Sequence, residues 1–384
     1  MKCERMTEST SALNRCPGVL CWLALALALA VAPLHAAPIT SDLQQSFQVS
    51  PGGHLVMEVD RGSITLQTGD RAEVNIEVKR SLSDVRSAKA EEIFAKHEVT
   101  FEQNDNRVLV RAKYQSPAKG WLGRDENKLQ VKYLVSLPKR FHVDLNTAGG
   151  SLTVSDLDGV AQVRTSGGNI DLAEVSGKID AQTAGGSIKL KQGGAETMLR
   201  TSGGNIQIEK VCGETKATTA GGSISVGLAE QKLTVKTSGG NINLGTLRTE
   251  TEADTAGGSI TVGTAEGALR TRTSGGNIRI TRAHGAVSAT TAAGSVSVAF
   301  AEQPGADCQL STSGGDITVS LVETLAFTVE ASTGAGSIRT EIPVASKVTG
   351  EQRSGRLNGT INGGGKKLVL KASAGRININ KLNE

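Results

Sequence analysis

Aromatic side chains are scarce in this chain of 384 residues, which has six Phe, two Trp and two Tyr. A conventional globular core takes much of its buried area from such side chains, so another kind of interior is expected. Only eight prolines are present and the 46 glycines have no three-residue period, which excludes collagen. The formal net charge is only +4, which argues against bulk disorder and against nucleic acid as a partner.

The first 36 residues have the pattern of a secretory signal peptide. A basic start precedes an apolar run from Val19 to Ala32, and a small-residue cleavage site follows at Ala36. The run is shorter than the roughly 20 residues that span a bilayer, so no transmembrane span is expected after cleavage. Cys21 lies near the start of this run and not just after it, so it is not placed for lipid attachment. The sequence therefore predicts an exported protein of the periplasm, the cell surface or the extracellular space.

A five-residue motif, TAGGS or TSGGN, recurs with a period of 18 residues. The two versions alternate, so the full repeat has 36 residues. A fixed short period is typical of a solenoid, in which each coil buries its apolar face only against its neighbours. Close copies of the motif begin at Thr147, Thr165, Thr183, Thr201, Thr219, Thr237, Thr255, Thr273 and Thr291, and looser copies begin at Thr312 and Thr333.

The residues on both sides of each motif alternate between apolar and polar. The fifth and seventh residues after each Thr are branched aliphatic, as at Ile188 and Leu190. The residue two before the Thr is large and small in turn, as at Leu199, Ala217 and Val235. Because 18 residues leave no room for a crossover helix, we predict an all-β, single-stranded parallel β-helix with one coil per repeat, stacked about 4.8 Å apart. A right-handed helix is favoured, with a left-handed one as the alternative.

The repeats divide the chain into four predicted parts: a signal peptide at 1–36, a β-rich capping region at 37–146, solenoid repeats at 147–342 and closing coils at 343–384. In the capping region, strands are expected at 47–59 and 101–112, and Arg61 to Ile64 is a degenerate copy of the motif. One helix is expected from Ser83 to His97, with Ser83 as its N-cap.

Two cysteines, Cys212 and Cys308, remain after signal cleavage. They fall five coils apart, which is about 24 Å along a parallel stack. A disulfide needs Cα atoms less than about 7 Å apart, so we expect two free thiols.

Catalytic and metal-binding patterns are missing from the sequence. There is no HExxH motif, and Gly363 to Lys366 lacks the spacing of a phosphate-binding loop. The acids Glu230, Glu266 and Glu302 recur every 36 residues, which disperses them instead of gathering a carboxylate pair. We therefore expect no catalytic, cofactor-binding or metal-binding residues and a protein that is not an enzyme.

A row of cations precedes the TSGGN motifs, at Arg164, Arg200, Lys236 and Arg272. Such a row suits an acidic glycan or another anionic envelope component, and Trp121 on a polar loop is a further candidate contact. The alternative interpretation is an ordinary solvated face whose charges are spaced two coils apart to avoid repulsion, and for Trp121 it is packing against the capping region.

The export signal, the β-rich first segment and the T-x-G-G-[SN]-I-x-[LIV] coils together resemble the bacterial "putative adhesin" β-strand-repeat family. The resemblance covers most of the mature chain and is strongest from Thr147 to Val319. It implies an exported solenoid of unknown function, without catalytic residues to transfer. The first prediction is an adhesin or envelope-glycan-binding surface protein. A structural or self-assembling envelope scaffold that associates end to end is the alternative, followed by a glycan-active β-helix enzyme.

Overall fold

A computed structural model describes residues 38–115, 128–346 and 355–382 of the chain. Two 16-stranded sheets, called sheet A and sheet B below, and one α-helix make up the regular structure of these residues. The expected signal peptide and Trp121 both lie outside the described residues. The described part of the chain contains no helix of sufficient length and apolarity to cross a membrane.

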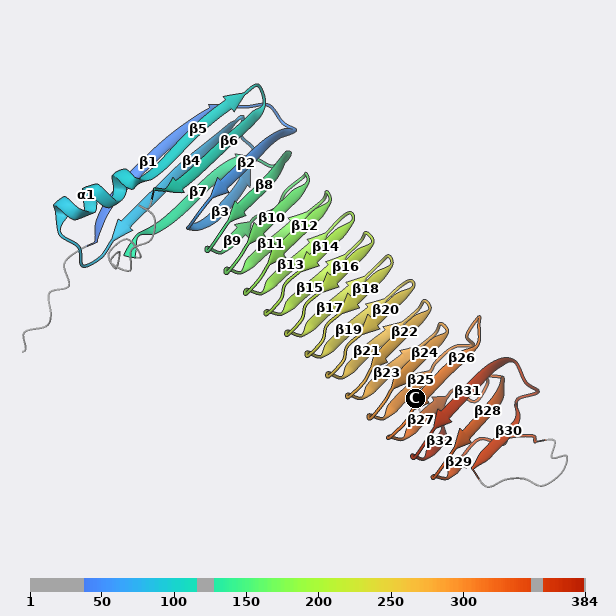
Figure 1. Cartoon of the computed structure of the whole chain (residues 1–384). Coiled ribbons are helices and arrows are strands. Elements are labelled where there is room, and N and C mark those ends of the chain that lie inside the picture. Colours follow the sequence, from blue (N-terminus) through green and yellow to red (C-terminus); the bar gives the residue numbers. More distant parts are fainter. Residues whose placement is uncertain (1–37, 116–127, 347–354, 383–384) are drawn as a thin grey trace, which may run out of the picture. The chain divides into compact units, whose positions relative to one another are not determined.

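Each coil of the regular stack contributes one strand to sheet B and the next strand to sheet A (Figure 1). The spatial order of sheet A is β1 (Ile39–Gln48), β4 (Glu73–Leu82), β7 (Gln130–Pro138), β3 (Ser63–Gly69), β9 (Leu152–Val154), β11 (Ile170–Val175), β13 (Ile188–Gly193), β15 (Ile206–Val211), β17 (Ile224–Ala229), β19 (Ile242–Leu247), β21 (Ile260–Ala265), β23 (Ile278–Ala283), β25 (Val296–Phe300), β27 (Ile317–Leu321), β32 (Ile377–Lys381) and β29 (Ile338–Thr340). The spatial order of sheet B is β5 (His97–Asn104), β6 (Arg107–Tyr114), β2 (Gly53–Val59), β8 (Phe141–Thr147), β10 (Ala161–Thr165), β12 (Ile179–Thr183), β14 (Thr197–Arg200), β16 (Thr215–Thr218), β18 (Leu233–Lys236), β20 (Thr251–Asp254), β22 (Leu269–Thr273), β24 (Val287–Thr291), β26 (Cys308–Thr312), β31 (Lys366–Ala372), β28 (Phe327–Thr333) and β30 (Arg356–Ile361).

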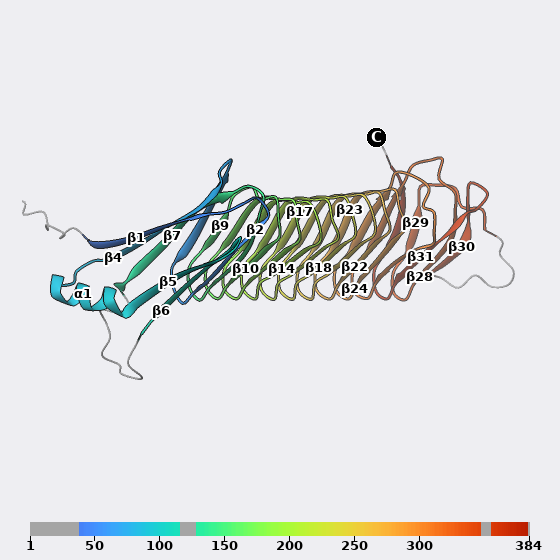
Figure 2. The ribbon, with the colours of Figure 1, turned by 90° about the horizontal axis from the view of Figure 1, so that it is seen from above.

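The strands of the stack pair in parallel, each residue beside its equivalent in the next coil. Ile170 of β11 lies beside Ile188 of β13, an offset of 18 residues. The offset becomes 21 where the repeat lengthens, so that Ala289 of β24 lies beside Leu310 of β26. Figure 2 shows the coils as successive parallel loops. The predicted all-β parallel solenoid is confirmed.

The core lies between the two sheets and is filled mainly by aliphatic side chains. In sheet B, Ala181 lies between Val163 and Leu199, and all three are fully buried. Alternating large and small side chains let successive coils interdigitate without voids. This packing explains how a chain with so few aromatics builds a continuous interior.

The motif turns are held by side-chain hydrogen bonds that repeat from coil to coil. The Oγ1 of Thr255 donates to the carbonyl oxygen of Gly240 in the preceding coil (2.9 Å) and accepts from the amide of Gly258 (3.2 Å). The amide of Ser259 donates to Oδ1 of Asn241 (2.8 Å), and the Ser259 hydroxyl accepts from the Asn amide of the next coil. Ser and Asn thus alternate, because the side-chain oxygen of each accepts a hydrogen bond from the backbone amide of the other in the next coil.

The N-terminal segment contains the one helix of the described residues, α1 (Ser87–Lys96), which buries Ala90, Ile93 and Phe94 against the core. The expected start at Ser83 is wrong. Strand β4 continues to Leu82, and Asp84 has a left-handed φ of 58°, which a helix cannot contain. The helix therefore begins after Arg86, which caps it without a side-chain hydrogen bond.

Two of the expected N-terminal strands are each interrupted by a turn. Gly52, at φ 87°, separates β1 from β2, and Asp105, at φ 51°, separates β5 from β6. The degenerate motif at Arg61 to Ile64 is confirmed as part of a coil, since β3 pairs in parallel with β9 and Thr147 Oγ1 donates to the Gly62 carbonyl oxygen (3.0 Å).

The C-terminal segment does not follow the chain order. The looser repeat at Thr333 does not stack directly on the repeat at Thr312, and the closing coils predicted at 343–384 do not simply follow it. Instead β31 lies between β26 and β28, and β32 lies between β27 and β29 (Figure 1). The last coil of the chain is therefore inserted between two earlier coils.

Candidate functional site

The four predicted cations occupy equivalent places on the outer face of sheet B. Arg164, Arg200, Lys236 and Arg272 belong to β10, β14, β18 and β22, each directly before the position of the buried motif Thr. The strands between them carry Gln182, Thr218 and Asp254 at the same place. The structure thus places the row on one face, as the spacing predicted.

Two of these cations are neutralised by acids of neighbouring coils. Arg164 Nη2 lies 2.9 Å from Asp180 Oδ2. Lys236 Nζ lies 3.0 Å from Asp254 Oδ2 and 3.6 Å from Glu252 Oε1. The hydrogen bond to Asp254 raises the pKa of Lys236. Arg164 and Lys236 are therefore poorly available to an external anion.

The other two cations, Arg200 and Arg272, are exposed and have no ion-pair partner within residues 38–115, 128–346 and 355–382. Lys216 on β16 and Arg270 on β22 are also exposed on this face and equally free of ion pairs in the described ranges. We call Arg200, Lys216, Arg270 and Arg272 the cation patch. Sequence reasoning missed Lys216 and Arg270, which the same period-2 alternation places outward, three residues before a motif Thr.

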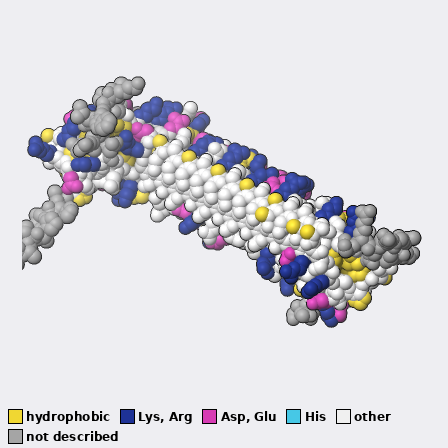
Figure 3. Space-filling model, turned by 60° about the horizontal axis from the view of Figure 1, so that its bottom comes forward, with side chains coloured by type: hydrophobic (Ala, Val, Ile, Leu, Met, Phe, Trp, Pro, Cys, Tyr) yellow, Lys and Arg dark blue, Asp and Glu magenta, His cyan; other side chains and the backbone are white. Residues whose placement is uncertain are grey.

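A strip without charge borders this face. The turns of the nine close copies of the motif contain no ionisable residue, and their alternating Ala and Ser side chains are exposed, as at Ala220 and Ser238. Figure 3 shows a face of the stack that is nearly free of charged side chains, with isolated hydrophobic side chains along it and Lys and Arg along one edge. An extended polymer on sheet B beside the turns would meet cations and neutral hydroxyl or amide groups together.

The opposite edge of the stack carries coil-to-coil ion pairs. Its loops join sheet A strands to sheet B strands and pair a base with an acid of the next coil, as in Lys178–Glu196 (2.8 Å) and Lys232–Glu250 (3.3 Å). Two of the dispersed acids follow the same rule, Glu230 with Lys210 and Glu266 with Arg248, and Glu302 Oε1 lies 3.3 Å from His284 Nδ1. These acids are each engaged separately, and the structure does not bring them together.

Cys212 and Cys308 are both free, as predicted. Cys308 is buried in β26, and this burial raises its pKa to about 11. Cys212 is half-buried; burial and a hydrogen bond with Glu230 raise its pKa. A raised pKa disfavours the thiolate, so neither side chain has the character of a nucleophile.

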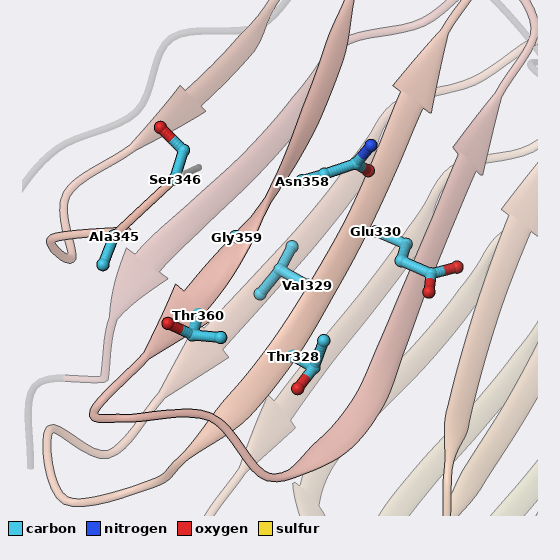
Figure 4. Close-up of a pocket in the computed structure, with 8 residues that line it drawn as sticks. All are labelled: Thr328, Val329, Glu330, Ala345, Ser346, Asn358, Gly359 and Thr360. Atoms are coloured by element: carbon cyan, nitrogen blue, oxygen red, sulfur yellow. The ribbon is translucent and has the colours of Figure 1, made fainter. Parts of the chain in front are cut away.

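A cleft of about 630 Å³ lies at the C-terminal end, beside β28 and β30 (Figure 4). Its ionisable side chain is Glu330, which pairs with Lys367 (3.0 Å) and points away from Thr360. A second cleft of about 480 Å³ is lined by exposed charges of both signs, including Asp70, Arg71 and Asp158. No group of three His, Cys, Asp or Glu residues in the described part of the chain is placed to hold a metal.

Comparison with known proteins identifies the fold family. A family model described as Toastrack DUF4097 matches residues 53–272 and 264–380. Among solved structures, the chain is similar to a "putative adhesin" from Bacteroides fragilis, with 11% identity, a TM-score of 0.32 and coverage of 88% of this chain and 97% of that chain. It is also similar to a "putative lipid binding protein" from Parabacteroides distasonis, with 13% identity, a TM-score of 0.25 and coverage of 89% and 97%. A search of curated proteins finds no match.

Proposed function

The chain belongs to the Toastrack DUF4097 family, in agreement with the resemblance predicted from its coil motif, and from this premise we propose that it is an exported, non-enzymatic surface protein. It binds acidic glycans of the cell envelope along the outer face of sheet B. The signal-peptide pattern of residues 1–36 supports export.

The cation patch is the observation that carries this proposal. Arg200 and Arg272 lie four coils apart, which corresponds to about 19 Å along the sheet. Lys216 stands on the strand next to Arg200, and Arg270 stands on the same strand as Arg272. These two pairs of cations have no ion-pair partner in the described ranges, although Glu252 and Asp254 lie on the strand next to Arg270 and Arg272. Their spacing along the outer face of a sheet suits a long polyanion better than a small ligand.

Charge reversal tests the proposal. We expect the mature protein to bind polygalacturonate, an acidic glycan, at low salt and to release it as ionic strength screens the charges. The double variant Arg200→Glu/Arg272→Glu should bind roughly tenfold or more weakly, because four units of charge change at the site. Isothermal titration or surface plasmon resonance measures the affinity, with neutral dextran as a negative control.

The matched control lies on the other sheet. Arg279 and Arg282 on β23 are exposed, so Arg279→Glu/Arg282→Glu makes the same change in net charge on sheet A. This variant should keep most of the affinity. Equal losses in both variants would indicate a nonspecific effect of net charge, and no binding by the unmodified protein would exclude this function. Trp121→Ala tests the proposed aromatic contact in the same assay.

A further inference from the structure

The last coil of the chain occupies a slot between two coils that precede it in sequence. Five residues of β31 lie beside β26, from the pair Cys308–Leu368 to the pair Thr312–Ala372. On its other side, seven residues of β31 pair with β28. Strand β32 fills the equivalent place in sheet A, between β27 and β29. Without this coil, β26 to β29 would present four unpaired strand edges facing one another across a gap one coil wide.

The segment that connects this coil to the preceding strand is very short. Strand β30 lies on the far side of β28, and only residues 362–365, Asn-Gly-Gly-Gly, lead from it to β31. Asn362, Gly363 and Gly364 all have left-handed φ values, of 51°, 83° and 91°. Asn362 Nδ2 holds the bend by donating to the carbonyl oxygens of Glu323 and Leu325 (2.6 and 2.8 Å). Short hinges under strain favour exchange of the segment that they carry.

A side-chain hydrogen bond that recurs between the other coils is missing between this last coil and the regular stack. In the other coils, the motif Thr donates its hydroxyl to a glycine carbonyl of the preceding layer, as Thr312 does to Gly294 (2.7 Å). The last coil has Ala372 at that place, so it makes no such bond to the layer of Thr312. Its outer neighbour does make the bond, from Thr333 to Gly375 (2.7 Å).

We propose that residues 366–382 form an exchangeable donor coil and that the slot accepts the same coil from a second copy of this chain. Both arrangements form identical ladders in the slot, so protein concentration and hinge strain decide between them. Opening of the Asn-Gly-Gly-Gly hinge releases β31 and β32, and reciprocal insertion joins two chains at their C-terminal ends. The apolar residues Leu368, Leu370, Ile377 and Ile379 are fully buried in the slot and would remain so in the exchanged pair.

Cross-linking of paired cysteines tests this exchange in the mature chain carrying Cys212→Ser. Thr318 of β27 lies directly beside Asn378 of β32, and both are partly exposed. Neighbouring parallel strands place Cα atoms at about 4.8 Å, within the range of a disulfide. The variants Thr318→Cys and Asn378→Cys, made in separate chains of different mass, are mixed and then oxidised. A disulfide-linked heterodimer is expected, with a yield that rises with protein concentration.

The control uses Ser297→Cys of β25 with the same Thr318→Cys, because these two residues are equally adjacent but belong to coils that are not terminal. The slot pair should yield roughly tenfold more heterodimer than this control. Equal yields, or no heterodimer at any concentration, would overturn the proposal. The double variant Thr318→Cys/Asn378→Cys should close within one chain at high dilution. Failure to do so would show that the coil does not occupy the slot, and would equally overturn it.

Discussion

The motif threonine is the residue that ties one coil to the next. Thr255 makes two hydrogen bonds through its hydroxyl, to the Gly240 carbonyl and from the Gly258 amide, and it is only 7% exposed. Thr255→Val keeps the shape but leaves both backbone groups without this partner. We expect the free energy of unfolding to fall by about 1–3 kcal/mol, measured by urea denaturation. Thr255→Ser keeps the hydroxyl and should lose less than half as much; equal losses would assign the effect to packing.

His97 at the start of β5 makes stability depend on pH. It is 2% exposed, and burial lowers its pKa from 6.5 to about 4, with smaller effects of Asp60, Arg80 and Arg61. Between these two pH values, His97 is protonated in the unfolded chain but stays neutral in the folded chain. Stability is therefore complete above pH 6.5 and falls as the pH drops toward 4, by an amount on the order of 1–3 kcal/mol.

The variant His97→Gln tests this linkage, because it removes the group that titrates. Urea denaturation between pH 4 and 7 should show a flatter profile for His97→Gln than for the unmodified protein. His284→Gln, at a half-buried loop position beside Glu302, is the comparison variant that removes an imidazole elsewhere in the chain. An unchanged slope in His97→Gln would show that other groups cause the pH dependence.

At the scale of the turn element, the two glycines of each motif have different roles. None of the glycines in the motif copies from Thr147 to Thr333 has a left-handed φ. A Cβ on the second glycine, Gly222, would overlap the carbonyl oxygen of Gly204, whereas a Cβ on the first, Gly221, would come no closer than 3.5 Å to any atom outside its neighbours. The chain itself substitutes only the first position, with Ala293, Ala335 and Ala374.

Alanine substitution should therefore separate the two positions. Gly222→Ala forces neighbouring coils apart and is expected to cost about 2–3 kcal/mol or more in the free energy of unfolding. Gly221→Ala should stay within about 0.5 kcal/mol of the unmodified protein. Thermal or urea denaturation of the two variants side by side measures the difference. Similar stability of both would mean that the turn backbone relaxes around the added methyl group.

The elements that sequence predicted well are those fixed by the repeat. Inward positions and turn residues recur every 18 residues, so neighbours such as Ile170 and Ile188 could be paired in advance. The ion pairs of Arg164 and Lys236 join residues of neighbouring coils that are about one repeat apart. The repeat therefore also indicates their partners, Asp180 and Asp254. The insertion of β31 was not predictable in this way, because the period ends after Thr333 and strand neighbours there depend on tertiary contacts.

At the scale of the whole molecule, the 36-residue unit determines which side chains each coil contacts in the two neighbouring coils. Two alternations have this period: Ser with Asn in the turns, and large with small side chains in sheet B. Deletion of residues 219–254 removes one full unit. It brings Thr271, which now lies beside Ala253, next to Ala217, so the contact remains of the same kind. The turn order also remains TSGGN followed by TAGGS.

Deletion of residues 219–236 removes a single coil and breaks both alternations. Ala217 would lie beside Ala253, which leaves a void where Val235 packs, and Asn205 would meet Asn241 in place of Ser223. Although it shortens the stack by half as much, this deletion should lower the free energy of unfolding by about 2–3 kcal/mol more than deletion of 219–254. Urea denaturation of the two deletion variants measures the difference. A stack that lost stability only in proportion to the number of coils removed would show that successive coils are interchangeable, contrary to the alternation of their cores and turns.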